Sequence, residues 1–316
     1  MYLSCGDSLF DLFGIEESDD VAAIGLSGRV GGSPLNVALG IARLGHPAGF
    51  FTKISSDLFG RKLAAFMDQE KIDRRYSIPT DRHTTLAIVS LDETGTAVYD
   101  FYIDGTADRS IETHELPGEL SDVVGLHLAS YATVTEPTAS TLIALAKRES
   151  TTKFISYDPN IRLSIEPDVG IWRDKVREIV PMATLVKASE EDLDMLYPGR
   201  PIEEVQADWL EQGAEIVVIT LGGKGAKAAT RSGIRAFEDS QRITVVDTVG
   251  AGDTFQAGLI VWLMEKDRLS REGLSRCTSE EIHAMLRFAM KAAAITCSRQ
   301  GADLPRRSDL GLDVLA

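Results

Sequence analysis

The stretch VVDTVGAGDTFQAGL, residues 245–259, is apolar at both ends and broken by glycines in the middle. A strand that runs through glycines into a helix leaves several backbone N–H groups without partners at the helix start. The helix dipole adds positive potential there, so such a turn suits a phosphate group. The segment therefore predicts a phosphate-binding turn, and one acid, Asp253, directly follows its second glycine.

Two common phosphate-binding motifs do not fit this chain. The dinucleotide fingerprint needs a glycine three residues after the second one, but an acid, a threonine and a phenylalanine follow Gly252. A P-loop needs Gly-Lys followed by Ser or Thr, and the only Gly-Lys pair, Gly223-Lys224, is followed by glycine. The failed fingerprint counts against a nicotinamide dehydrogenase.

The acid beside this turn has two interpretations. Asp is a common N-cap, so Asp253 taken alone is equally consistent with a capping role. In its surroundings, however, the carboxylate repels the phosphate that the turn attracts, unless it faces a second substrate. A carboxylate beside a γ-phosphate can accept the proton of an attacking hydroxyl, while the N–H groups of residues 251–253 hold the charge on the transferred group. We therefore expect a base and an anion hole in one turn.

Composition argues against nucleic acid or membrane partners and against secretion. Asp and Glu number 48 against 33 Lys and Arg, which gives a net charge of −15. Nucleic acids and anionic membranes bind basic surfaces, so neither is expected as a partner. The three cysteines are widely scattered, the N-terminus lacks the basic region of a signal peptide, and no apolar run reaches membrane-spanning length. We expect a cytoplasmic protein.

The segment pattern predicts one α/β domain over residues 1–316 with a small β insert. From residue 124, strand-like and helical segments alternate as a parallel sheet requires. An alternating hairpin pattern over 84–104 and the segment 12–30 predict a small antiparallel sheet outside the main body, which forms a lid from about 12–30 and 84–110. Strands are expected within 2–13, 47–54, 124–130, 153–158, 183–189 and 215–222, and helices within 34–45, 57–70, 252–266 and 279–299, the last opening at Ser279.

Several segments, in this order, resemble the motifs of the ribokinase-like carbohydrate kinases, the phosphofructokinase B family. They are GGSPLNVALGIARLG (31–45), SYDPNIR (156–162), VKASEEDL (186–193), VITLGGKGA (218–226), DTVGAGDTFQAG (247–258) and ITCSRQGAD (295–303). The resemblance implies a three-layer α/β sandwich with a mainly parallel sheet and a small β-sheet lid. It also implies an ATP-dependent sugar kinase.

The resemblance assigns roles to individual residues. It implies that Asp253 is the catalytic base, that Gly250, Ala251 and Gly252 form the anion hole, and that Gly252 also contacts the nucleotide. Asp11, taken as the acid that closes the first strand, is implied to bind sugar hydroxyls with Gly31, Gly32 and Asn36. The remaining nucleotide contacts are implied to be Lys187, Ser189, Thr220, Gly222 and Gly225. The family uses ATP with Mg²⁺, and many members use K⁺ near the position of Asp247.

Two positions depart from the family pattern. An Asn-x-x-Glu motif for metal and phosphate reads Ser189 to Asp192 here, so the amide is lost and the acid is shortened. We expect Glu191 and Asp192 to support Mg²⁺ through water. Met290 stands where several members carry an asparagine near the adenine, which puts a hydrogen bond to the base there in doubt.

The substrate is expected to be a free sugar, most often fructose in this branch. Arg162 of DPNIR is implied to contact the sugar or the phosphate, with a salt bridge to Asp158 or a neighbour as the structural alternative. Phe101 and Tyr102 are expected to stack on the sugar or to pack within the hairpin. The alternative substrate, 2-keto-3-deoxygluconate, needs a cation for its carboxylate, a role open to Arg109.

The resulting hypothesis is transfer of the γ-phosphoryl group to a primary hydroxyl, giving fructose 6-phosphate from fructose. The alternative of another class is a non-catalytic sensor that binds sugar or nucleotide. Lid sheets of this family often pair, so a homodimer through the lid is also open.

Overall fold

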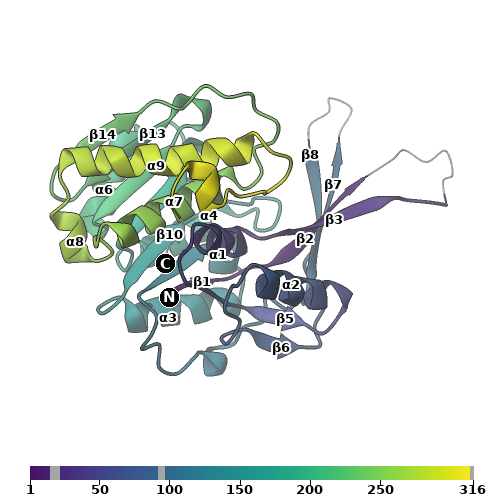
Figure 1. Ribbon diagram of the computed structural model, residues 1–316. Coiled ribbons are helices and arrows are strands. Elements are labelled where there is room, and N and C mark those ends of the chain that lie inside the picture. Colours follow the sequence, from purple (N-terminus) through teal and green to yellow (C-terminus); the bar gives the residue numbers. More distant parts are fainter. Residues whose placement is uncertain (15–21, 92–96, 314–316) are drawn as a thin grey trace.

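The computed structural model describes residues 1–14, 22–91 and 97–313, and they form a large sheet, a small sheet and a two-stranded ribbon (Figure 1). The large sheet has the order β14-β13-β12-β11-β10-β9-β1-β4, parallel from β4 to β12 and antiparallel at β13 and β14. Its strands are β1 (Tyr2–Cys5), β4 (Ala48–Phe51), β9 (Gly125–Ala129), β10 (Phe154–Asp158), β11 (Leu185–Ser189), β12 (Ile216–Thr220), β13 (Ala226–Thr230) and β14 (Arg235–Glu238).

Helices cover both faces of this sheet, and apolar residues alternate between the two sides. On β12, Val218 packs with the helices of one face, whereas Val217 and Ile219 pack with those of the other. The first face carries α1 (Ser33–Arg43), α2 (Leu58–Gln69), α7 (Ala251–Glu265), α8 (Arg271–Ser275) and α9 (Ser279–Cys297). The second carries α3 (Thr138–Glu149), α4 (Val169–Ile179), α5 (Glu190–Leu196) and α6 (Ile202–Gln212). The expected three-layer sandwich is confirmed.

The small sheet projects beside this body with the order β3-β2-β7-β8 (Figure 1). Its strands are β2 (Leu9–Gly14), β3 (Leu26–Gly31), β7 (Thr85–Leu91) and β8 (Ala97–Tyr102), and the ribbon pairs β5 (Lys53–Ser55) with β6 (Ile78–Thr80). The hairpin of β7 and β8 is confirmed, although its expected turn at 92–96 lies outside the described residues. The expectation of a wholly antiparallel sheet is wrong, because β2 and β7 pair in parallel.

The first strand ends earlier than the sequence pattern suggests. β1 stops at Cys5, and Gly6 with φ 137° turns the chain into β2. Asp11 therefore lies within β2, opposite Arg29 of β3, and does not close the first strand. The acid after β1 is Asp7 instead.

The predicted helices occur near their expected ends. Pro34 lies in the first turn of α1, and α1 ends just before Gly45, whose φ is 94°. The N-cap of α9 is Thr278 and not Ser279, because the Thr278 hydroxyl and the Glu281 side chain form a capping box. No helix in the described parts of the chain is long and apolar enough to cross a membrane.

Candidate active site

A cavity of about 640 Å³ opens at the carboxyl ends of the parallel strands, where loops of the large sheet face the small sheet. Its walls come from the segment after β1, the start of α1, the loops after β10, β11 and β12, and the turn before α7. Leu9, Asp11 and Phe101 of the small sheet complete it. The cavity therefore brings together most of the residues that the motifs singled out.

Asp253 lies buried at this cavity, in the first turn of α7, and is 6% exposed. The N-cap of α7 is Gly250, with φ 77°, so the capping interpretation of Asp253 does not hold. Its carboxylate instead accepts hydrogen bonds from α1, from Ser33 Oγ at 2.7 Å and from Asn36 Nδ2 at 2.8 Å. Burial raises the pKa of Asp253 above its ordinary value, and the two hydrogen bonds oppose this shift.

The backbone of the turn has N–H groups that are placed as the predicted anion hole requires. The N–H groups of Gly252 and Asp253 lie in the first turn of α7, where a helix offers them no acceptor. The N–H of Ala251 already donates to the Thr248 carbonyl at 3.2 Å. Gly250, Gly252 and Asp253 line the cavity, and Ala251 is not among the lining residues. The geometry thus favours Gly252 and Asp253 as the donors.

Acids gather at the end of the cavity beside the small sheet. Burial raises the pKa of Asp11 to about 6, and Arg162 opposes the shift. Any side chain at Gly31 would collide with the Asp11 carboxylate. Asp7, which the motif analysis missed as a site residue, lines the same space at 1% exposure. Its Oδ1 has no hydrogen-bond partner within the described chain, and burial raises its pKa well above the ordinary value.

The start of α1 supplies two more site residues. Gly32 lines the cavity with φ 112°, and a side chain there would press on the Asp7 backbone. Ser33, also missed from the sequence, accepts a hydrogen bond from Asn160 Nδ2 at 2.9 Å while it donates to Asp253. Asn36, expected to contact the sugar, donates to Asp253 and also lines the cavity. The Gly-Gly-Ser-Pro segment was the available signal for Ser33.

The aromatic pair on β8 divides between two environments. Phe101 is half-buried and lines the cavity. Tyr102 is 61% exposed, because neighbouring residues of a strand point to opposite faces of the sheet. Only Phe101 of the two is therefore placed to reach a molecule in the cavity.

Arg162 lines the cavity and makes no salt bridge to Asp158. Its Nη1 donates to the Ile161 carbonyl at 2.8 Å, and its charge opposes the rise in pKa that burial causes at Asp7, Asp11 and Asp253. The alternative of a salt bridge from Arg162 to Asp158 is wrong, because another cation already pairs with that carboxylate.

That cation is Lys187, which is 3% exposed and lines the cavity. Its Nζ lies 2.7 Å from Asp158 Oδ2, and a Cβ placed on Gly252 would be 3.1 Å from the same Nζ. Burial lowers the pKa of Lys187, but Asp158, Asp192 and Asp253 outweigh it and the pKa is raised. Lys187 is therefore a charged donor next to the anion-hole turn.

The segment from Ser189 to Asp192 forms a capping box at the start of α5. Asp192 Oδ2 accepts from the Ser189 N–H at 2.8 Å and from Ser189 Oγ at 2.6 Å, and Oδ1 accepts from the Ile161 N–H at 2.8 Å. Asp192 thus joins two cavity loops, whereas Glu191 is exposed on the wall. Among the residues that the structure describes, no group of three His, Cys, Asp or Glu side chains is arranged for a metal ion.

The loop after β12 forms the other end of the cavity. Thr220 and Gly222 line it, and Gly222 has φ 55°. Gly225 does not line it; with φ 116°, it lies against the Glu238 backbone, where a side chain would clash. Met290, 8% exposed, belongs to the core and is absent from the cavity wall.

Two other expected residues lie beside or away from the cavity. Asp247 accepts from the Val249 N–H at 3.0 Å and from the Gly301 N–H at 2.8 Å. Arg109 contacts the Ile103 carbonyl at 3.1 Å and lines a separate cavity of about 310 Å³. Arg109 is therefore not positioned for a substrate carboxylate in the main cavity.

Comparison with known proteins agrees with this site. The model of the pfkB family carbohydrate kinases matches residues 1–309. A fructokinase from Rhizobium leguminosarum bv. trifolii is 36% identical over 271 residues, 86% of this chain and 82% of the relative. A fructokinase structure with bound ATP from Xylella fastidiosa has a TM-score of 0.89 at 25% identity, covering 98% of this chain and 96% of that one.

A second solved structure carries a sugar. The fructokinase from Vibrio cholerae O395 with bound fructose, ADP and calcium ion has a TM-score of 0.80 at 27% identity, covering 98% of this chain and 97% of that one. The family model spans nearly the whole sequence, and the buried Asp253, the turn before α7 and the acidic cavity end occur together in the structure. The chain therefore belongs to the pfkB family of carbohydrate kinases.

Proposed function

We propose that this protein transfers the γ-phosphoryl group of ATP to the primary hydroxyl of free fructose, giving fructose 6-phosphate. The observation that carries the proposal is the buried Asp253 carboxylate in the first turn of α7. It lines the same cavity as the acids beside the small sheet and the N–H groups of the anion-hole turn. The similar fructokinases, solved with ATP or with fructose and ADP, support the same pair of substrates.

In this mechanism each group that lines the cavity has one chemical role. The Asp253 carboxylate accepts the proton of the sugar hydroxyl as its oxygen attacks the γ-phosphorus and the bond to the β-phosphate oxygen breaks. The N–H groups of Gly252 and Asp253 and the ammonium of Lys187 stabilise the negative charge on the transferred group. The small sheet and the cavity walls exclude water, which would otherwise accept the phosphoryl group.

The donor set fits a magnesium ion held mainly by the nucleotide and water. Glu191 is exposed on the cavity wall, whereas both Asp192 oxygens accept hydrogen bonds from protein groups. Glu191 is therefore the better candidate of the two to bind the ion through water. Mg²⁺ bound with ATP supplies positive charge between the phosphates. The proposed potassium site near Asp247 rests on that carboxylate, which already fixes the turn.

Charge favours a neutral sugar over a keto acid. Asp11 and Asp253 line the cavity at the proposed sugar position, and their carboxylates repel a substrate carboxylate. Lys187 is paired with Asp158, and Arg109 lines the other cavity. Arg162 is then the remaining cation for that carboxylate, so 2-keto-3-deoxygluconate is the less favoured substrate.

The test is ADP release from MgATP with a panel of acceptors: fructose, 2-keto-3-deoxygluconate, ribose, glucose, adenosine and fructose 6-phosphate. We expect the highest kcat/KM with fructose, and a repeat with potassium replaced by a larger organic cation tests the potassium site. Faster turnover of another sugar would keep the kinase and reject fructose. ATP binding without turnover of any acceptor would favour the non-catalytic sensor.

Acidic pH is expected to weaken sugar binding. The pKa of Asp11 is about 6, so this carboxylate becomes protonated as the pH falls through 6 and loses acceptor capacity for sugar hydroxyls. We expect the KM for fructose to rise about tenfold for each pH unit below that value. The Asp11→Asn variant should have a raised KM at neutral pH that lacks this acid dependence. An unchanged acid limb in the variant would assign the dependence to another group.

We also propose that the protein forms a homodimer and acts in the cytoplasm. A homodimer through the small sheet is supported by the outer positions of β3 and β8 in the described sheet and by the exposed Tyr102. Light scattering with a Tyr102→Lys variant tests it, since a dimer through this face should dissociate. Action in the cytoplasm is supported by three cysteines that are all free, and cell fractionation tests it.

A further inference from the structure

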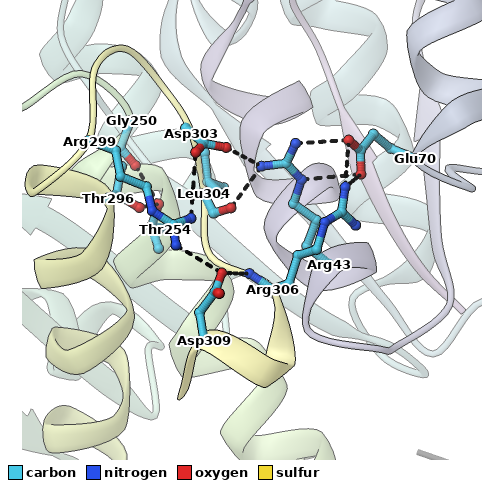
Figure 2. Close-up of polar contacts among 10 residues, drawn as sticks. All are labelled: Arg43, Glu70, Gly250, Thr254, Thr296, Arg299, Asp303, Leu304, Arg306 and Asp309. Atoms are coloured by element: carbon cyan, nitrogen blue, oxygen red, sulfur yellow. Dashed lines mark hydrogen bonds and ion pairs between the residues drawn. The ribbon is translucent and has the colours of Figure 1, made fainter. Parts of the chain in front are cut away.

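An ionic cluster of Arg43, Glu70, Asp303 and Arg306 lies outside the lining of the main cavity (Figure 2). Arg43, at the end of α1, donates from Nε and Nη2 to both oxygens of Glu70 at 3.1 and 2.8 Å. Its Nη1 donates to Asp303 Oδ1 at 2.9 Å and to the Leu304 carbonyl at 2.7 Å. The side chains of Arg43 and Glu70 are 12% and 2% exposed. One guanidinium thus links α1, the end of α2 and the segment 301–304.

The segment 301–304 forms the back of the anion-hole turn. The Gly301 N–H donates to Asp247 Oδ2 at 2.8 Å. A Cβ placed on Gly250 would lie 2.8 Å from the Ala302 Cβ and 3.5 Å from the Leu304 side chain. Leu304 is fully buried. The position of this segment therefore limits where Gly250, and the N–H groups that follow it, can lie.

Helix α1 orients the Asp253 carboxylate, the proposed base. Its first turn carries Ser33 and Asn36, both bonded to Asp253. A Cβ on Gly40 would lie 2.6 Å from the Ala257 Cβ, so α1 and α7 are in tight contact there. Arg43 therefore joins the helix that orients the base to the segment that supports the anion hole.

We propose that Arg43 is a positioning residue for phosphoryl transfer. By tying α1 to residues 303 and 304, it fixes the α1 groups that orient the Asp253 carboxylate relative to the turn before α7. The proposal rests on the proposed kinase function. Glu70 holds the guanidinium in place, and Arg306 supports it, because its Nη2 lies 3.0 Å from Glu70 Oε2. Burial raises the pKa of Glu70, but Arg43 and Arg306 outweigh it, and the lowered pKa keeps the carboxylate charged.

The kinetic test compares Arg43→Met with a matched arginine elsewhere. Arg271 also bridges backbone carbonyls, including Gly213 at 2.8 Å and Ala183 at 3.2 Å, at the opposite end of the sheet. Both variants lose stability, but we expect only Arg43→Met to lower kcat, by about 10²-fold, with KM for fructose and ATP nearly unchanged. Arg43→Lys keeps the charge but not the fork, and is expected to recover part of kcat. Equal losses of kcat in Arg43→Met and Arg271→Met would overturn the proposal.

A second measurement does not depend on the substrate. Amide hydrogen exchange of the peptide over 247–254 is expected to speed up in folded Arg43→Met and to stay at the wild-type rate in Arg271→Met. Unchanged exchange in Arg43→Met would overturn the proposal even if kcat fell. If wild-type protein failed to phosphorylate fructose, the proposed function would fall, while the exchange comparison would still decide whether Arg43 orders the turn.

Discussion

The Asp253→Asn variant is expected to lose about 10²–10⁴-fold in kcat while it still binds ATP. An amide keeps the shape of the carboxylate. Its oxygen can accept from Asn36 and its nitrogen can donate to Ser33, whose hydroxyl rotates to accept. The buried contacts at 2.7 and 2.8 Å therefore survive, and the variant loses mainly the ability to take a proton. Steady-state kinetics with fructose and titration of ATP binding measure the two effects separately.

The matched control removes one hydrogen bond and keeps the base. Ser33→Ala deletes the donor to Asp253 Oδ1, so the carboxylate remains but is held less firmly. We expect a smaller loss of kcat than in Asp253→Asn. Turnover near the wild-type rate in Asp253→Asn would remove this residue from the role of base, and another acceptor at the cavity, such as Asp7, would have to be tested.

Local chemistry explains why the turn before α7 could be recognised from the sequence. A glycine break between apolar segments exposes N–H groups wherever the rest of the chain lies, so Gly250, Gly252 and Asp253 were identifiable without tertiary information. The alternation of strands and helices from residue 124 likewise follows from periodicity. The α/β class, with its parallel sheet, and the position of the glycine turn were predictable for these reasons, whereas the three-layer sandwich followed from the family resemblance.

Residues that act through tertiary contacts escaped the same reasoning. Asp7 carries no local pattern, and only the fold places it beside Asp11 and Asp253. Arg109 has the right charge for a substrate carboxylate but follows β8 into the second cavity. Lys187 pairs with Asp158, although the two residues are 29 positions apart in the sequence, and this pairing excludes the salt bridge from Arg162 to Asp158. Burial and long-range neighbours, which no spacing encodes, fixed these outcomes.

The Lys187→Met variant is expected to lose both stability and activity, for separable reasons. Lys187 and Asp158 have side chains 4% and 1% exposed, and their charged atoms are 2.7 Å apart. Removing the ammonium leaves the carboxylate buried without its cation, which lowers the free energy of unfolding by about 3–5 kcal/mol. Burial already raises the pKa of Asp158 to about 6 with the lysine present, so protonation of the orphaned acid at neutral pH reduces part of this loss.

A double variant separates folding from catalysis. Lys187→Met with Asp158→Asn removes both charges, so most of the lost stability should return in urea unfolding. Activity should not return, because Nζ of Lys187 lies next to the anion-hole turn and its loss removes a charged donor to the phosphoryl group, which lowers kcat by about 10²–10³-fold. Recovery of kcat together with stability would mean that Lys187 serves the fold alone. A stable but inactive double variant would mean that the buried Lys187 ammonium serves catalysis by contacting the transferred phosphoryl group.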